Sequence, residues 1–139
     1  PGSGEDVAWR TGVAGPVNAT PIKTAVAGNA LAVQISSVAA FVGAGPVLVG
    51  QFYLNGNPPF AIVGYPYVRV DPVGAFVIFN GAALAGGFTL PLPAAGLTFQ
   101  YTVPPGLVGY TLRLQGIALS AAAINGAFAT THAHEIVFQ

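Results

Sequence analysis

The chain has 139 residues and contains neither cysteine nor methionine. Without cysteine it has no disulfide framework, no thiolate nucleophile and no thiolate metal ligand. Cysteine and methionine are also the side chains most open to oxidation, so their absence suits a protein exposed outside the cell. The chain starts at Pro1 rather than at methionine. We therefore expect an extracellular or cell-surface protein from which a leader has been removed.

Charged side chains are the second shortage. Only 6% of the residues are Asp, Glu, Lys or Arg, with four of each sign, whereas ordinary globular proteins have about 25%. The chain lacks the basic cluster that binding to nucleic acid requires. It also has no uninterrupted apolar run long enough for a transmembrane helix, so we expect no membrane insertion. A net charge of zero on a chain that is 53% hydrophobic favours self-association, and the expected partners are copies of itself.

Glycine and proline, by contrast, are frequent and evenly spread. The chain has 19 glycines and 12 prolines, which interrupt helices and mark turns between short strands. Between these turns, apolar and polar residues alternate with the period of two that is typical of half-buried strands. The pattern predicts an all-β fold, a β-sandwich or jelly roll of eight to ten short strands, in a single domain spanning 1–139.

The clearest pattern lies at 97–119. In its first half Phe99, Tyr101 and Val103 alternate with polar residues, and a second alternating run follows 109. Pro104-Pro105-Gly106 lies between them and suits a turn, because proline fixes φ and glycine accepts positive φ. We predict two strands joined by a short turn, forming the central hairpin of the fold.

The remaining elements follow from the same signals. We expect one helical turn at 120–125, which is rich in alanine. The segment at 46–54 is apolar on both faces, so it should be a strand covered on both sides. The full set of further predicted strands is 7–13, 22–27 at a sheet edge, 30–36, 46–54, 60–70, 75–79, 86–92 and 134–138.

Two stretches carry a family resemblance: the segment 6–31, with Lys23-Thr24-Ala25, and the ending VPPGLVGYTLRLQGIALSAAAINGAFATTHAHEIVF. They resemble the C-terminal β-domain of secreted and surface proteins of planctomycete-type bacteria, which has a similar proline–leucine–glycine turn, an LQG strand and a closing NG…TNAHEI segment. The resemblance implies a secreted or surface-associated β-domain with no assigned activity. It transfers no catalytic residues.

One constellation could carry metal chemistry, at His132-Ala133-His134-Glu135. The two histidines would share a strand face, a spacing that lets two imidazoles meet one metal ion. A catalytic zinc site needs three protein ligands, however, and the chain has only these two histidines and no cysteine. We favour polar histidines at a strand edge, and we expect no metal and no cofactor.

Two features suggest contact with glycans. The triplet that begins at Asn18, Asn-Ala-Thr, is an N-glycosylation sequon in an expected exposed loop. Aromatic residues could form a platform for a sugar ring, although packing in the core or in an interface explains them better. The residues in question are Tyr65-Pro66-Tyr67, Tyr53 and Trp9.

No nucleophile and base are arranged in a recognisable motif, so we expect that the chain is not an enzyme. The preferred function is a secreted subunit of a pilus-like or sheath-like homopolymer, an extracellular filament or surface array. Residues 1–20 could act as an arm that adds a strand to a neighbouring subunit. In that arm Val7, Trp9 and Val13 would fill pockets of the neighbour. Alternatively, this segment completes its own sandwich, and the chain is a surface binding module for a glycan or a protein.

Overall fold

The computed structural model describes residues 2–59, 67–84 and 86–139, and within them the fold is all-β, with nine strands and no helix. This confirms the predicted fold class and falls within the predicted range of strands. No helix that could cross a membrane occurs in these residues. The strands are β1 (Ala8–Val13), β2 (Ile22–Ala25), β3 (Ala30–Ser36), β4 (Gly45–Leu54), β5 (Phe76–Asn80), β6 (Leu97–Thr102), β7 (Tyr110–Leu119), β8 (Phe128–Thr130) and β9 (His134–Phe138).

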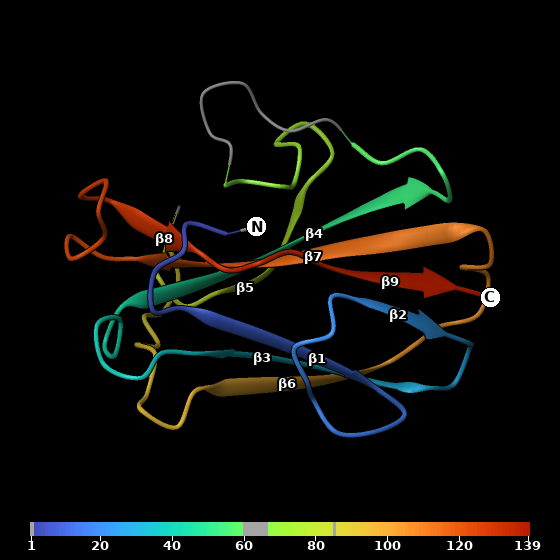
Figure 1. Cartoon of the computed structure of the whole chain (residues 1–139), viewed down its shortest axis with the longest axis horizontal. Helices are drawn as coiled ribbons and strands as arrows, with labels where there is room; N and C mark the ends of the chain where they lie inside the picture. The colour runs from blue at the N-terminus through green and yellow to red at the C-terminus, as the bar shows by residue number, and fades with distance from the viewer. Residues whose placement is uncertain (1, 60–66, 85) are drawn as a thin grey trace.

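The strands form two sheets that face each other (Figure 1). The smaller sheet has the order β1-β3-β6 and is antiparallel throughout. The larger sheet has the order β2-β9-β7-β4-β5. The short strand β8 pairs with 117–119 of β7, whereas β9 pairs with 111–114 of the same strand. The pairs of the larger sheet are antiparallel except for β2 with β9, which are parallel. The edges of this sandwich are therefore β1 and β6 in one sheet and β2 and β5 in the other.

Burial explains why these segments are strands. In β3, buried Leu31, Val33 and Ile35 alternate with more exposed residues, as a sheet with one solvated face requires. In β4, the residues at 46–51 are all buried, which confirms that this strand is covered on both sides. One face of β4 meets the core, and the segment at 67–71 crosses the other.

The core lies between the two sheets and is closely packed around Trp9, which is only 4% exposed. Room for its indole comes from Gly116 on β7. A Cβ at that position would lie 3.1 Å from Cε3 of Trp9 and 2.9 Å from Cδ1 of Ile35. Fully burying a side chain such as Leu114 or Ile136 in this layer contributes about 1.5–3 kcal/mol.

The predicted central hairpin at 97–119 is wrong in its pairing, although both strands exist. β6 pairs with β3 in the smaller sheet, and β7 pairs with β4 in the larger one. The connection at 103–109 therefore crosses from one sheet to the other. Its start is held by Asn29, whose carbonyl accepts a 2.9 Å hydrogen bond from the Val103 amide. Alternation predicts that a segment is a strand, but it does not predict the partner.

Three smaller predictions also fail. The segment at 86–92 is not a strand and forms a single β-bridge, from Thr89 to Ala82, because Gly86 and Gly87 take positive φ values that break an extended run. The segment at 120–125 forms turns instead of a helical turn. Of the predicted strand at 60–70, residues 60–66 lie outside the described residues, and 67–70 are not in a strand. The short strand β8 was not predicted.

The N-terminal segment pairs with its own chain. β1 lies antiparallel to β3 along its whole length, from Ala8 opposite Ser36 to Val13 opposite Leu31. Val7 and Trp9 are buried in the core of the same chain. This is the alternative that the sequence left open. A role for Val7, Trp9 and Val13 between subunits stays a prediction, and it would require the segment to leave this sheet first.

Candidate functional site

One side of the sandwich is closed by a buried polar contact between β1, β2 and β9. The hydroxyl oxygen of Thr11 lies 2.8 Å from Nδ1 of His134, and Nζ of Lys23 donates a 2.9 Å hydrogen bond to the same hydroxyl. Lys23 also donates to the carbonyl of Thr20. Because Thr11 lies in the smaller sheet while Lys23 and His134 lie in the larger one, these bonds join the two sheets.

The environment of His134 keeps its imidazole neutral. Burial, followed by the positive charges of Lys23 and His132, lowers the pKa of His134 to about 4. At neutral pH its Nδ1 can therefore accept the proton of the Thr11 hydroxyl, while that oxygen accepts from Lys23. His134 is 1% exposed, so the prediction of a polar histidine at a strand edge is wrong for it. His132 is exposed and precedes β9.

The two histidines do not form a shared metal site with the surrounding groups. Among residues 2–59, 67–84 and 86–139, no group of three histidine, cysteine or carboxylate side chains is close enough to hold a metal ion. Nδ1 of His134 contacts Thr11, and Glu135 is paired with Arg113. That the chain uses no metal or cofactor stays a prediction.

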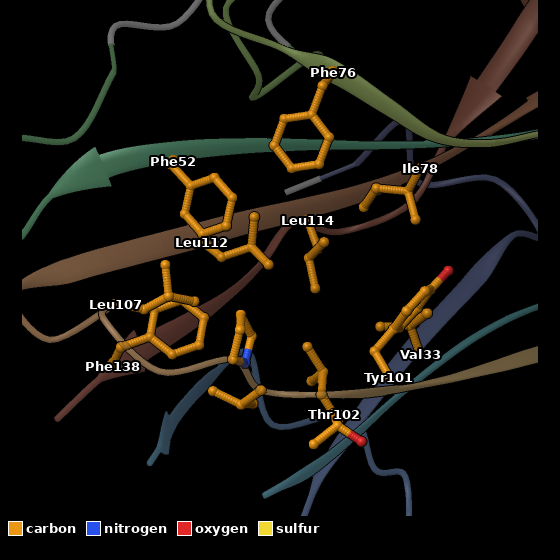
Figure 2. Close-up of a pocket in the computed structure, with 13 residues that line it drawn as sticks. Val33, Phe52, Phe76, Ile78, Tyr101, Thr102, Leu107, Leu112, Leu114 and Phe138 are labelled. Atoms are coloured by element: carbon orange, nitrogen blue, oxygen red, sulfur yellow. The ribbon is translucent and has the colours of Figure 1, made fainter. Parts of the chain in front are cut away.

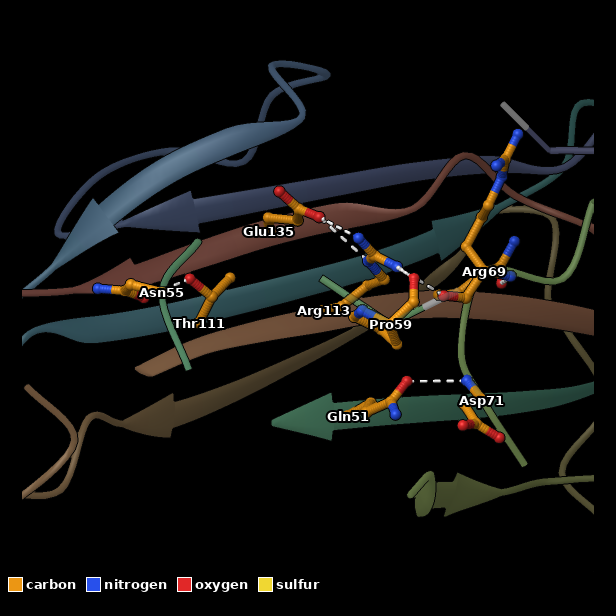
Figure 3. Close-up of polar contacts among 9 residues, drawn as sticks. Gln51, Asn55, Pro59, Arg69, Asp71, Thr111, Arg113 and Glu135 are labelled. Carbon is orange, nitrogen blue, oxygen red and sulfur yellow. Dashed lines mark hydrogen bonds and ion pairs between the residues drawn. The ribbon is translucent and has the colours of Figure 1, made fainter. Parts of the chain in front are cut away.

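A second polar cluster lies on the outer face of the larger sheet, around Arg113 of β7 (Figure 3). Its Nη2 lies 2.7 Å from Oε1 of Glu135, and its Nε donates to the same oxygen at 3.0 Å. Its Nη1 donates to the carbonyls of Arg69 at 3.0 Å and Pro59 at 3.3 Å. The guanidinium carbon lies 5.3 Å from the ring centroid of Tyr53. Arg113 thus attaches Pro59 and Arg69, which both lie in the connection between β4 and β5, to the larger sheet.

Two glutamines complete this attachment. Oε1 of Gln51 accepts a 2.8 Å hydrogen bond from the Asp71 amide, and Oε1 of Gln115 accepts one of the same length from the Arg69 amide. Nε2 of Gln115 donates to the carbonyl of Tyr67 at 2.7 Å. The two side-chain amides therefore form hydrogen bonds with the backbone at 67–71 that a neighbouring strand would otherwise form. Sequence reasoning missed them because a glutamine within a strand indicates a solvent-facing position.

The opposite side of the sandwich opens into a groove with a volume of about 420 Å³ (Figure 2). The groove lies between the sheets, and its walls come from both of them. Among the residues that the structure describes, no charged side chain lines it, and Tyr101 and Thr102 are the only polar residues of the lining. The lining residues are Leu31, Val33, Phe52, Phe76, Ile78, Tyr101, Thr102, Val103, Pro104, Leu107, Leu112, Leu114 and Phe138.

Aromatic rings stand at the groove's mouth. The rings of Phe52 and Phe76 stack with centroids 5.6 Å apart, and Phe52 also meets Phe138 at 6.2 Å. Phe52, Phe76 and Tyr101 are each about 40% exposed, so together they form an apolar patch at the surface. Partial burial raises the pKa of Tyr101, so its hydroxyl stays protonated and can donate a hydrogen bond.

The edge strands β5 and β6 flank this groove. Neither strand contains a charged residue or a proline, and each is paired on one side only within the described part of the chain. Near one end the two strands are joined by Phe79 and Phe99, whose ring centroids are 4.6 Å apart. Lysine, inward charge and proline are the usual devices that keep an exposed edge from pairing with another chain, and β5 and β6 have none of them. We call this feature, two unprotected edges with an apolar groove between them, the open side.

The predicted glycosylation site lies at the surface. Asn18 is exposed, and its backbone pairs with Thr11 through two hydrogen bonds of 2.9 and 3.1 Å. Its side-chain oxygen accepts a 3.0 Å hydrogen bond from the Thr20 amide. The position is accessible, and its glycosylation stays a prediction.

The aromatic platform considered for sugar binding is not assembled from the described residues. Trp9 is buried in the core, and Tyr53 lies under the guanidinium of Arg113 on the outer face. Tyr67 is about half exposed, whereas Tyr65 lies outside the described residues. The packing role that the sequence favoured is confirmed for Trp9.

Comparison with known proteins adds little to this picture. No protein-family model matches the chain, and no curated protein sequence matches it. Among solved structures, the chain is similar to a cellulose-active polysaccharide monooxygenase from M. thermophila. The match has 13% sequence identity and a TM-score of 0.45, and it covers 88% of this chain and 55% of that chain. A likeness at this level is not evidence of a shared activity.

Proposed function

We propose that the chain is a secreted structural subunit that assembles with copies of itself into an extracellular filament or surface array. The observation that carries the proposal is the open side, where, within the described residues, β5 and β6 are each paired on one side only and contain no protecting charge. An edge of this kind can template a strand of another molecule. The proposal moves the expected strand addition from the N-terminal arm to these two edges.

The pairing between subunits does not have to be symmetric. If β5 of one subunit pairs with β6 of the next, the two surfaces in contact are different. Such a heterologous contact continues from subunit to subunit unless the rotation happens to close a ring. Main-chain hydrogen bonds would supply most of the contact, and exposed side chains such as Val77, which is 59% exposed, would add apolar contact. A filament is therefore the expected product.

The surface charge supports the same conclusion. Eight charged side chains are distributed over 7043 Å² of accessible surface, and two of them, Arg113 and Glu135, are paired with each other. Copies with a net charge of zero repel each other weakly, so electrostatics does not oppose their association.

The experiment is sedimentation velocity of the whole chain over a range of concentrations, with two charge variants. Val77→Lys and Gln100→Lys each place a charge on one of the proposed edges, and we expect both to reduce polymer strongly. Val38→Lys adds the same charge at a highly exposed position in the turn after β3, so it should assemble like the unmodified chain. Edge variants that polymerise as well as Val38→Lys would contradict the proposal.

The other function considered from the sequence, a surface module that binds glycan or protein, has less support for its glycan form. Sugars are held by several convergent polar groups, often with an aromatic ring beneath. The groove on the open side has an aromatic rim but only two polar lining residues, Tyr101 and Thr102. If the chain stays monomeric at high concentration, a binding function takes the place of the structural one.

A further inference from the structure

We propose that the groove on the open side is a binding site for a neutral, apolar small molecule. This goes beyond self-assembly and does not depend on it. The groove's volume of about 420 Å³ falls within the range of roughly 300–1,000 Å³ that ligand pockets have. It is bounded by side chains of both sheets, so a ligand would be enclosed between two walls (Figure 2).

The lining determines the chemical class of the ligand. In the described part of the chain, no lysine, arginine, histidine or carboxylate lines the groove, and Arg113, Glu135, Lys23 and His134 make contacts elsewhere. An ionised group placed among these side chains would lose its hydration and find no partner. A sugar would likewise leave most of its hydroxyls without hydrogen bonds. The buried part of the ligand is therefore uncharged and made mainly of carbon.

Gly50 of β4 leaves room for two side chains that line the groove. A Cβ on Gly50 of β4 would lie 2.9 Å from Cζ of Phe76 and 3.0 Å from Cδ1 of Ile78. The missing side chain lets Phe76 and Ile78 pack down onto β4, on one wall of the groove. The lining presents almost no polar surface, so a ligand needs no polar group inside the groove.

The test uses N-phenyl-1-naphthylamine, a neutral dye that fluoresces in apolar surroundings, and the full chain at a concentration where it sediments as a monomer. We expect saturable binding of one dye per chain and its displacement by 1-decanol. Ile78→Trp fills the groove and should weaken dye binding at least about tenfold. Val38→Trp adds the same side chain at a 90% exposed position outside the groove and should leave the affinity unchanged.

A second variant protects the test against misfolding. Leu107→Trp obstructs the groove from the connection at 103–109, where Leu107 is only partly buried. Circular dichroism and the melting temperature report whether each variant is folded. The proposal is overturned if the dye does not saturate, if folded Ile78→Trp and Leu107→Trp bind it as well as Val38→Trp does, or if only assembled fractions bind it. Because the dye is measured on monomer, a failure of self-assembly leaves this result unaffected.

Discussion

Protonation of His134 should make the fold unstable in mild acid. The ordinary pKa of histidine, 6.5, falls to about 4 in the folded chain because the imidazole is buried near Lys23 and His132. Between these two values the unfolded chain binds a proton that the folded chain excludes, so stability is lost as the pH falls from about 6.5 to about 4. One pKa unit corresponds to about 1.4 kcal/mol, so the free energy of unfolding should drop by about 3 kcal/mol across this window.

The assay is urea denaturation at several pH values between 4 and 7, followed by the fluorescence of Trp9. This is the only tryptophan of the chain, and it is buried in the core, so its emission reports global unfolding. Asp6 does not interfere, because its backbone and Ser37 hydrogen bonds lower its pKa to about 2, so its stabilisation is lost only below pH 4. The variant His134→Gln should show little loss of stability over the window.

The matched control is His132→Gln, which removes the exposed histidine and should keep most of the unmodified chain's loss in acid. The explanation would be refuted if the unmodified chain and His134→Gln gave parallel curves of unfolding free energy against pH. It would also be refuted if His132→Gln, rather than His134→Gln, flattened the curve.

Two further substitutions test the packing and the outer face. Gly116→Ala places a Cβ 2.9 Å from Ile35 in the core and should destabilise the fold by about 1–3 kcal/mol. Gly15→Ala, whose Cβ would make only an ordinary 3.7 Å contact with the Val13 carbonyl oxygen, should leave the urea midpoint almost unchanged. Arg113→Met removes the ion pair with Glu135 and two hydrogen bonds to the backbone of the connection between β4 and β5. Limited proteolysis should therefore cut this connection sooner. Exposed Arg10→Met should not change the cleavage rate, and equal rates in the two arginine variants would contradict this role.

The strands themselves could be predicted from the sequence because alternation is a local property. The buried run in β4 and the edge position of β2 were also predicted correctly. Strand pairing could not be predicted, since β6 and β7 show the same alternation whether they pair with each other or with β3 and β4. Which partner each strand takes depends on how the rest of the chain packs over both sheets.

The functional features were harder to predict for a related reason. His134 is buried because Thr11 and Lys23 reach it from distant strands, and a sequence does not show which remote residues will satisfy a polar group. The groove is defined by space that no side chain fills, and the composition carries no signal for it. The shortage of charge did point to exposed apolar surface, and the structure locates such surface at the open side.

Cysteine trapping tests the proposed contact between β5 and β6 most directly, because the chain has no cysteine of its own. Chains carrying Val77→Cys are mixed with chains carrying a cysteine at Thr98, Gln100 or Thr102, the outward positions of β6, and are then oxidised. Disulfides form only when the two Cα atoms come within about 7 Å. We predict a high yield of mixed disulfide for at least one of the three β6 positions. Yields no higher than those with Val38→Cys in place of Val77→Cys would contradict assembly through these edges.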